Sequence, residues 1–95
     1  MADGDLTIRA FQRLIRKRYY ETDARRGAAG TFLLLMEEVG ELATALHATA
    51  SGQSADDAAR ANLQEEFADV MAWLTTLANV AEVDLESALR KYTEE

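Results

Sequence analysis

Two acidic segments of the sequence combine residue types and a spacing that suit metal binding. The first segment reads Glu37-Glu38-Val39-Gly40-Glu41-Leu42 and the second reads Glu65-Glu66-Phe67-Ala68-Asp69-Val70. Each has two acids, an apolar residue, a small residue, a third acid and another apolar residue. Residues three or four apart share one face of a helix, so each segment would present at least two carboxylates together. If the two helices pair, these carboxylates converge on a divalent cation.

An exposed acidic face is the main alternative interpretation. Acids on exposed helix surfaces usually pair with a Lys or Arg four residues further on. None of the six acids has such a partner, and Glu37 and Glu65 are each followed there by another acid. The acids also stand among apolar residues, where an uncompensated charge is costly. This pattern favours a bound cation over a solvated face.

The ligand types indicate which metal would bind. Ligation by oxygen alone favours Mg²⁺, Mn²⁺ or Ca²⁺ over zinc, and the chain has no cysteine. A ferritin-like di-iron site would use Glu-x-x-His pairs, but the single histidine, His47, belongs to neither segment. Mg²⁺ retains several waters when bound, which suits a site with few carboxylates, so we predict Mg²⁺, with Mn²⁺ as the substitute. Spacing alone leaves the ligand set open, because Glu37 and Glu41 are also one helical turn apart.

A small residue lies between the acids of each segment. Gly40 costs roughly 1 kcal/mol relative to Ala inside a helix, so its presence needs a compensating reason. Gly40 and its counterpart Ala68 would allow the two helix backbones to approach closely. We expect that close approach at the metal site.

The rest of the sequence supplies the helices that would position the acids. The chain has no proline, and its apolar residues recur at helical spacing. The predicted helices are Ile8 to about Tyr20, Phe32 to about Ala50, about Ala55 to Val80, and Leu85 to about Tyr92, with a connection over Glu21–Gly30. Their predicted N-caps are Thr7, Thr31, Ser54 and Asp84. The sequence therefore predicts one all-α domain over residues 1–95, a four-helix bundle-like fold with residues 1–6 flexible.

The third predicted helix is apolar almost all round between Phe67 and Val80. A helix with this pattern is normally buried on every side. A chain of 95 residues has little core in which to bury it. We therefore expect a homo-oligomer, either a homodimer or a homotetramer.

Charge and composition exclude several classes of protein. The net charge of −7 argues against general nucleic-acid binding. The sequence has no apolar run of about 20 residues, and its first residues lack the pattern of a signal peptide. A cytoplasmic protein without membrane contact is the simplest expectation. Seven of the ten basic residues lie between Arg9 and Arg26, where they form either a solvated surface or an attraction for an anionic ligand.

The acidic segments resemble the signature of a known family. Glu37-Glu38-x-x-Glu41, followed after 24 residues by Glu66-x-x-Asp69 and later by Val83-Asp84-Leu85-Glu86, is similar to the MazG-like all-α nucleoside triphosphate pyrophosphohydrolases. The similarity extends roughly from Thr7 to Tyr92. It implies Mg²⁺-dependent hydrolysis of a nucleoside triphosphate to the monophosphate and pyrophosphate, with a role in nucleotide-pool sanitation.

The resemblance also implies roles for individual residues. By analogy, the metal ligands are Glu38, Glu41, Glu66 and Asp69, which resolves the choice that spacing left open. Glu37 would join a second metal or activate the attacking water, with a purely structural acid as the alternative. We therefore predict Glu37 and Glu38 as the catalytic residues.

Candidates for substrate binding follow from position and from the resemblance. Lys91 stands where the family places a basic residue after its fourth helix, so it is either a phosphate ligand or a surface lysine. Arg16 is a second candidate for the phosphates. Trp73 follows Asp69 by one turn and would stack on a nucleobase or pack in the core. The family signature does not determine which base or which sugar the substrate carries. The alternative function is a non-catalytic oligomerisation or regulatory module with a vestigial metal site.

Overall fold

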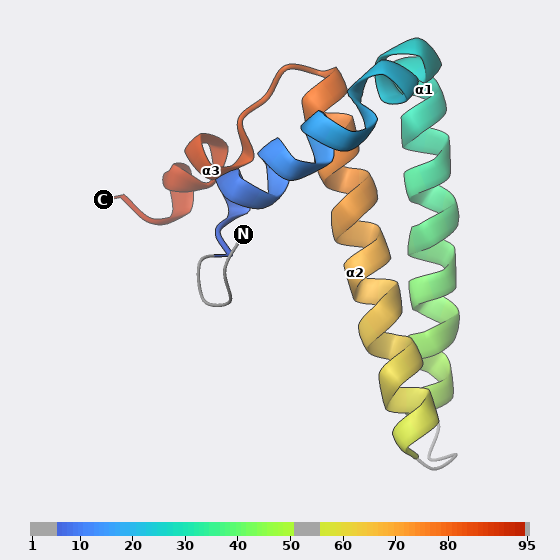
Figure 1. Cartoon of the computed structure of the whole chain (residues 1–95). Coiled ribbons are helices and arrows are strands. Elements are labelled where there is room, and N and C mark those ends of the chain that lie inside the picture. Colours follow the sequence, from blue (N-terminus) through green and yellow to red (C-terminus); the bar gives the residue numbers. More distant parts are fainter. Residues whose placement is uncertain (1–5, 51–55, 95) are drawn as a thin grey trace.

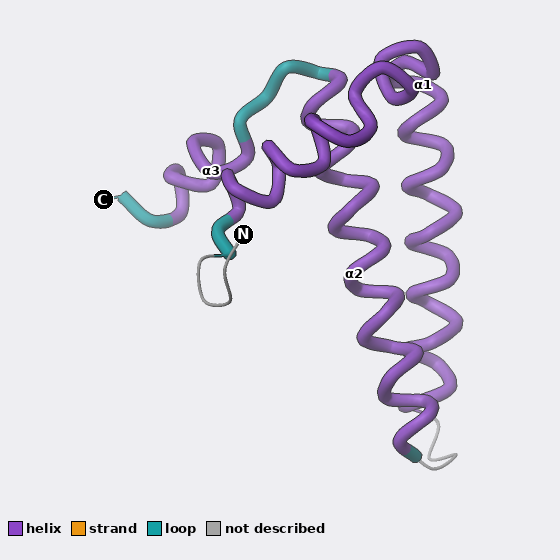
Figure 2. The backbone as a smooth tube through the Cα atoms, viewed as in Figure 1, coloured by secondary structure: helices purple, strands orange, loops and turns teal. Residues whose placement is uncertain are grey.

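The computed structural model describes residues 6–50 and 56–94. Every regular element in these ranges is helical, which confirms the all-α class. The elements are α1 (Ile8–Ala50), α2 (Asp57–Val80), α3 (Leu85–Ala88) and a short 3₁₀ helix, η1 (Leu89–Tyr92). Figure 1 shows α1 and α2 as the two long elements, and Figure 2 shows how little of the described chain is loop.

A sharp bend at Gly27 divides α1 into a first part, residues 8–26, and a second part, residues 28–50 (Figure 1). Gly27 has φ 83° and ψ 172°, a backbone conformation that is essentially restricted to glycine. The predicted connection over Glu21–Gly30 is therefore wrong, because one glycine makes the bend and helix continues on both sides. Thr31 is not an N-cap but a fully buried residue within α1.

The other helix ends follow the local capping rules. The side chain of Thr7 accepts a hydrogen bond from the Ala10 amide at 3.0 Å, and that of Asp84 accepts one from the Ser87 amide at 3.1 Å. Both predicted caps are confirmed. Asp56 caps α2 by accepting from the Ala59 amide at 2.7 Å. The cap predicted at Ser54 lies outside the described residues, as do residues 1–5 of the segment predicted to be flexible.

The first part of α1 packs across the C-terminal half of α2 and holds α3 in place. The buried side chain of Gln12 donates to Asn79 Oδ1 at 3.0 Å and accepts from the Leu85 amide at 2.9 Å. Arg9 forms ion pairs with Asp84 at 2.7 Å and with Glu86 at 2.8 Å. These polar contacts fix the orientation of the first part of α1, while its second part runs alongside α2.

A single chain buries little apolar surface. The buried hydrophobic side chains among the described residues are Leu35, Ala45, Leu63 and Ala78. Several side chains of the helix predicted to be buried are exposed in the single chain, among them Phe67 at 51% and Met71 at 45%. The Cα radius of gyration is 15.3 Å, compared with about 12 Å for a compact domain of this length. Within the described ranges, neither long helix has an apolar stretch that would cross a bilayer.

Candidate metal centre

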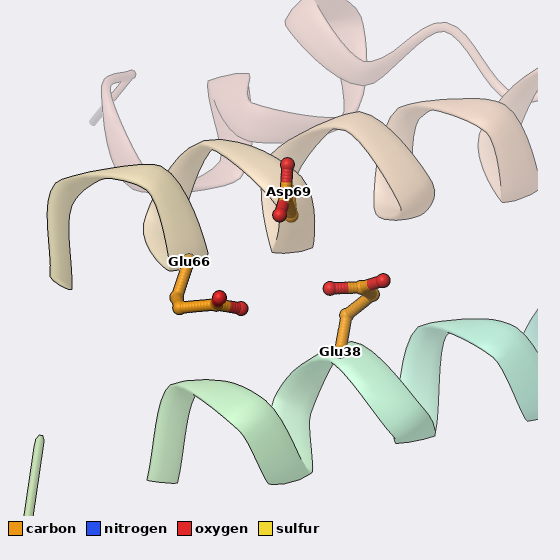
Figure 3. Close-up of side chains that lie close together, drawn as sticks. All are labelled: Glu38, Glu66 and Asp69. Carbon is orange, nitrogen blue, oxygen red and sulfur yellow. The ribbon is translucent and has the colours of Figure 1, made fainter. Parts of the chain in front are cut away.

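Three carboxylates converge between the second part of α1 and α2. Glu38 comes from α1, and Glu66 and Asp69 come from α2, where they lie one turn apart (Figure 3). One oxygen atom from each side chain lies within 4.8 Å of the corresponding oxygens of the other two. Because two different helices supply the oxygens, the site depends on how the helices pair as well as on the spacing within each motif.

Two of these carboxylates have unsatisfied oxygens. Glu38 Oε2 and Glu66 Oε2 are buried and have no hydrogen-bond partner among the described residues. Nor does any ion pair in the described ranges include Glu38, Glu66 or Asp69. Buried polar atoms are normally paired, so these oxygens need a partner that the described residues of the chain do not supply.

Burial and neighbouring charge both act on the protonation of the centre. Burial raises the pKa of Glu38, and the nearby carboxylates of Glu41, Asp69 and Glu66 raise it further. Burial likewise raises the pKa of Glu66, with Glu41 and Asp69 as the next causes. Both shifts mean that the fully ionised centre is unfavourable without a positive charge. A hard divalent cation that prefers oxygen ligands fits this donor set.

Of the four predicted ligands, three meet in the cluster and the fourth lies beside it. Glu41 is exposed, but its carboxylate is close enough to contribute to the raised pKa values of Glu38 and Glu66. Glu37 is also exposed and lies outside the cluster. The ligand and catalytic roles of these acids stay predictions.

The expectation that Gly40 allows close helix approach is wrong within one chain. A Cβ atom added at Gly40 would meet nothing within 4 Å, so the glycine faces open space. Its counterpart Ala68 is exposed. At this level the side chains of Glu38 and Glu66 lie between the two helices (Figure 3), whereas Gly40 borders open space.

Within the described residues, no ion pair joins either predicted phosphate ligand to the carboxylates of the centre. Arg16 stacks on Tyr20, 4.0 Å from the ring centroid, and lies 3.7 Å from Glu82, beyond the C-terminal end of α2. That end is about 16 Å from Asp69 by helical rise. Lys91 is exposed on η1 with its amine 4.8 Å from the Tyr92 ring centroid. Their roles in phosphate binding stay predictions.

Trp73 belongs to a polar cluster that the sequence reasoning did not find. The Arg26 guanidinium lies 4.9 Å from the centroid of the Trp73 ring, pairs with the buried Asp23, and donates from Nε to Thr31 Oγ1 at 3.1 Å. A cavity of about 250 Å³ adjoins this cluster. The sequence signal in this region is the pair of glycines Gly27 and Gly30, which by itself predicts a connection and not a packed cluster.

The fold and the cluster together define an all-α protein with an acidic centre suited to a divalent cation. A family model described as the MazG nucleotide pyrophosphohydrolase domain matches residues 27–94. The match includes all four predicted metal ligands and begins at the bend in α1. A search of curated proteins finds no match. This chain belongs to the MazG nucleotide pyrophosphohydrolase domain family, as the acidic segments indicated.

Proposed function

We propose that this protein hydrolyses a nucleoside triphosphate between its α and β phosphates, releasing a nucleoside monophosphate and pyrophosphate. The metal would be Mg²⁺, or Mn²⁺ in its place, held by Glu38, Glu66 and Asp69 with Glu41 beside them. The observation that carries the proposal is the convergence of three carboxylate oxygens within 4.8 Å of one another. Two of the side chains, Glu38 and Glu66, also have a buried oxygen without a hydrogen-bond partner in the part of the chain that the structure describes.

The residues of the chain would divide the chemistry between them. When bound, a divalent cation neutralises phosphate charge and lowers the pKa of water. Glu38 and Glu66 are held on opposing helices, so their oxygens are positioned before substrate arrives. Glu37 precedes Glu38 and is exposed, which makes it our candidate for taking the proton of the attacking water. The oxygen of that water would bond to the α phosphorus while the bond from this phosphorus to the bridging oxygen breaks.

A homo-oligomer is the second part of the proposal. The chain exposes 6861 Å², whereas a compact monomer of 10.5 kDa would expose about 5,400 Å². The excess is larger than the roughly 800 Å² that each partner contributes to a standard interface. Exposed apolar side chains lie on both long helices: Phe32, Met36 and Val39 on α1, and Phe67, Met71 and Leu74 on α2. A second copy of the chain would cover these side chains, giving a homodimer or a homotetramer.

The wider role follows from the reaction. Cleavage to a monophosphate removes a nucleotide from the pool that polymerases use. We therefore propose nucleotide-pool sanitation in the cytoplasm, with no nucleic-acid or membrane partner. The net charge of −7 supports the absence of a nucleic-acid partner.

The direct test measures pyrophosphate release from a panel of ribo- and deoxyribonucleoside triphosphates. Pyrophosphatase and a phosphate dye would report the product with Mg²⁺, with Mn²⁺ and with EDTA. We expect metal-dependent release, at least about 100-fold slower in Asp69→Asn because several kcal/mol of metal-linked stabilisation would be lost. Glu65→Gln is the matched control, since Glu65 is an exposed acid on the same helix outside the cluster. Metal binding without release from any substrate would favour the non-catalytic alternative.

A further inference from the structure

The cavity beside Trp73 lies between the first part of α1 and α2. It has a volume of about 250 Å³, and its polar and aromatic lining consists of Tyr19, Thr22, Asp23, Arg26, Trp73 and Thr76. Pockets for whole drug-sized ligands typically measure about 300–1,000 Å³. This cavity is therefore suited to one flat group of a larger ligand.

Asp23 lines the cavity and carries an unsatisfied acceptor. The residue is only 4% exposed, and its Oδ1 atom accepts a hydrogen bond from Arg26. Its Oδ2 atom is buried and has no hydrogen-bond partner among the described residues. A buried acceptor without a donor costs free energy, so the lining is complementary to a ligand that supplies an N–H group.

Arg26 fixes the positions of both Asp23 and Trp73. It pairs with the Asp23 carboxylate, donates to Thr31 Oγ1 at 3.1 Å and covers the Trp73 ring at 4.9 Å from the centroid. Gly30 leaves the space for this side chain, because a Cβ atom there would lie 2.9 Å from Arg26 Cγ. The aromatic ring and the acceptor are thus held in place before a ligand arrives.

The cavity lies within reach of the carboxylate cluster. Trp73 and Thr76 follow Asp69 by four and seven positions, so all three share one face of α2. On α1, Thr31 precedes Glu38 by seven positions, or about 10 Å of helical rise. The lining residues Asp23 and Arg26 stand next to the bend of α1, so a nucleotide with its phosphates at the carboxylates would reach the cavity by extending its base toward that bend.

We propose that this cavity is the nucleobase subsite and that Asp23 selects bases with an exocyclic amino group, cytosine or adenine, over their keto counterparts. The inference rests on the proposed function, whose site it extends. Cytosine N4 and adenine N6 are amino donors that match the free Asp23 oxygen. Uracil and hypoxanthine place a keto oxygen at the same position, which would bring two acceptors together without a donor. Trp73 also lines the cavity and would supply an aromatic surface for the base beside Arg26.

Substrate pairs that differ only in this group provide the test. We would measure kcat/KM for CTP against UTP and for ATP against ITP, in the wild type and in Asp23→Asn. A hydrogen bond to a charged group predicts a preference for the amino substrate of about 10- to 100-fold. Asp23→Asn offers an amide donor in place of the free acceptor, so the preference should vanish or reverse. Glu21→Gln, an exposed acid two positions earlier, should keep the wild-type ratios.

The outcome distinguishes specificity from a structural role. If Asp23 only supports the bend, Asp23→Asn would slow all four substrates equally, and unchanged ratios would overturn the proposal. Equal kcat/KM values for both members of each pair in the wild type would also overturn it.

A binding measurement with analogues that are not hydrolysed tests the base subsite separately from the proposed hydrolysis. Trp73 is the only tryptophan, so its fluorescence reports on the cavity directly. We would titrate wild type and Asp23→Asn with the α,β-imido analogues of CTP and UTP in the presence of Mg²⁺. We expect the wild type to bind the CTP analogue more tightly than the UTP analogue, and Asp23→Asn to lack this preference. If the wild type binds both analogues equally, or binds neither, the proposed subsite is wrong. If the analogues are distinguished but no substrate is hydrolysed, the proposed hydrolysis fails while the subsite stands.

Discussion

Gln12 and Asn79, 67 positions apart in the chain, form a reciprocal pair of hydrogen bonds. Gln12 Nε2 donates to Asn79 Oδ1 at 3.0 Å, and Asn79 Nδ2 donates to the backbone carbonyl of Gln12 at 3.3 Å. The Gln12 side chain also donates to the Val83 carbonyl at 2.7 Å and accepts from the Leu85 amide. One buried amide therefore joins the first part of α1 to the end of α2 and to the start of α3.

Gln12→Ala should destabilise the fold by at least about 2 kcal/mol. The substitution removes the partner of the buried Asn79 Oδ1 atom, and also that of the Val83 carbonyl and the Leu85 amide, whose hydrogen bonds to Gln12 are partly buried. Urea unfolding followed by circular dichroism would measure the change. Gln64→Ala, at an exposed position of α2, is the control and should change stability by less than about 0.5 kcal/mol. Equal midpoints for the two variants would contradict this role of Gln12.

Gly27→Ala and Gly40→Ala should change stability in opposite directions. A Cβ atom at either position meets nothing within 4 Å, so steric contact does not distinguish them. Gly27 has a positive φ, so alanine there should cost about 1–3 kcal/mol. Gly40 lies in regular helix, where alanine should add roughly 1 kcal/mol. Urea midpoints that shift in the same direction would show that Gly27 does not impose the bend.

Mg²⁺ or Mn²⁺ should raise the melting temperature of the wild type. A ligand that binds only the folded state stabilises it by about 2.7 kcal/mol at a concentration 100 times its Kd. Glu38→Gln should remove most of this response. In EDTA the same variant should melt at a higher temperature than the wild type, because it lacks a charge that burial and neighbouring carboxylates disfavour. Differential scanning calorimetry with and without metal gives both comparisons, and a flat wild-type response would argue against the metal centre.

The Asp84 carboxylate should contribute to stability at neutral pH and lose that contribution in acid. Hydrogen bonds from Arg9 and then from Ser87 hold the pKa of Asp84 well below its usual value. The folded state therefore favours the ionised form. Its stabilisation is complete above the unfolded pKa of about 3.9 and declines as the pH falls below that value. The melting temperature of Asp84→Asn should be lower than that of the wild type at pH 7. The difference between the two melting temperatures should become smaller as the pH falls toward about 2.

The matched control for this pH series is Asp57→Asn. Asp57 is exposed in the first turn of α2 and forms no ion pair among the described residues. Its variant should follow the wild-type profile in acid. If the difference in melting temperature between the wild type and Asp84→Asn stays constant across the pH series, the charge of Asp84 does not cause it. The effect would then come from the shape of the side chain.

The exposed apolar side chains predict the association state. Light scattering should give a mass that is a multiple of 10.5 kDa. Replacing Phe67 or Met71 by Asp should shift the protein toward the monomer, because each side chain is about half exposed in one chain and charge is disfavoured in interface cores. Tyr92→Asp is the control, since Tyr92 is 78% exposed and lies outside the two long helices. A monomeric wild type would contradict the proposed oligomer.

The sequence alone determined the all-helical class, two of the helix caps and the acidic residues of the centre. These features depend on local spacing: Thr7 and Asp84 cap the residues that follow them, and Glu66 and Asp69 share a face because they are three residues apart. The lack of a Lys or Arg four residues after each acid is likewise a feature of the local sequence. The family match then agreed with the resemblance that these acids carry.

Only the tertiary structure decided how the helices meet. Glycine signals a break, but whether the chain loops or bends depends on what buries the next turn, and Thr31 is fully buried within α1. The convergence of Glu38 with the acids of α2 depends on the rotation of one helix against the other, which spacing within a helix does not set. Asp23 and Trp73 line one cavity across 50 positions of sequence. Contacts at such separations arise from packing, and local periodicity does not encode them.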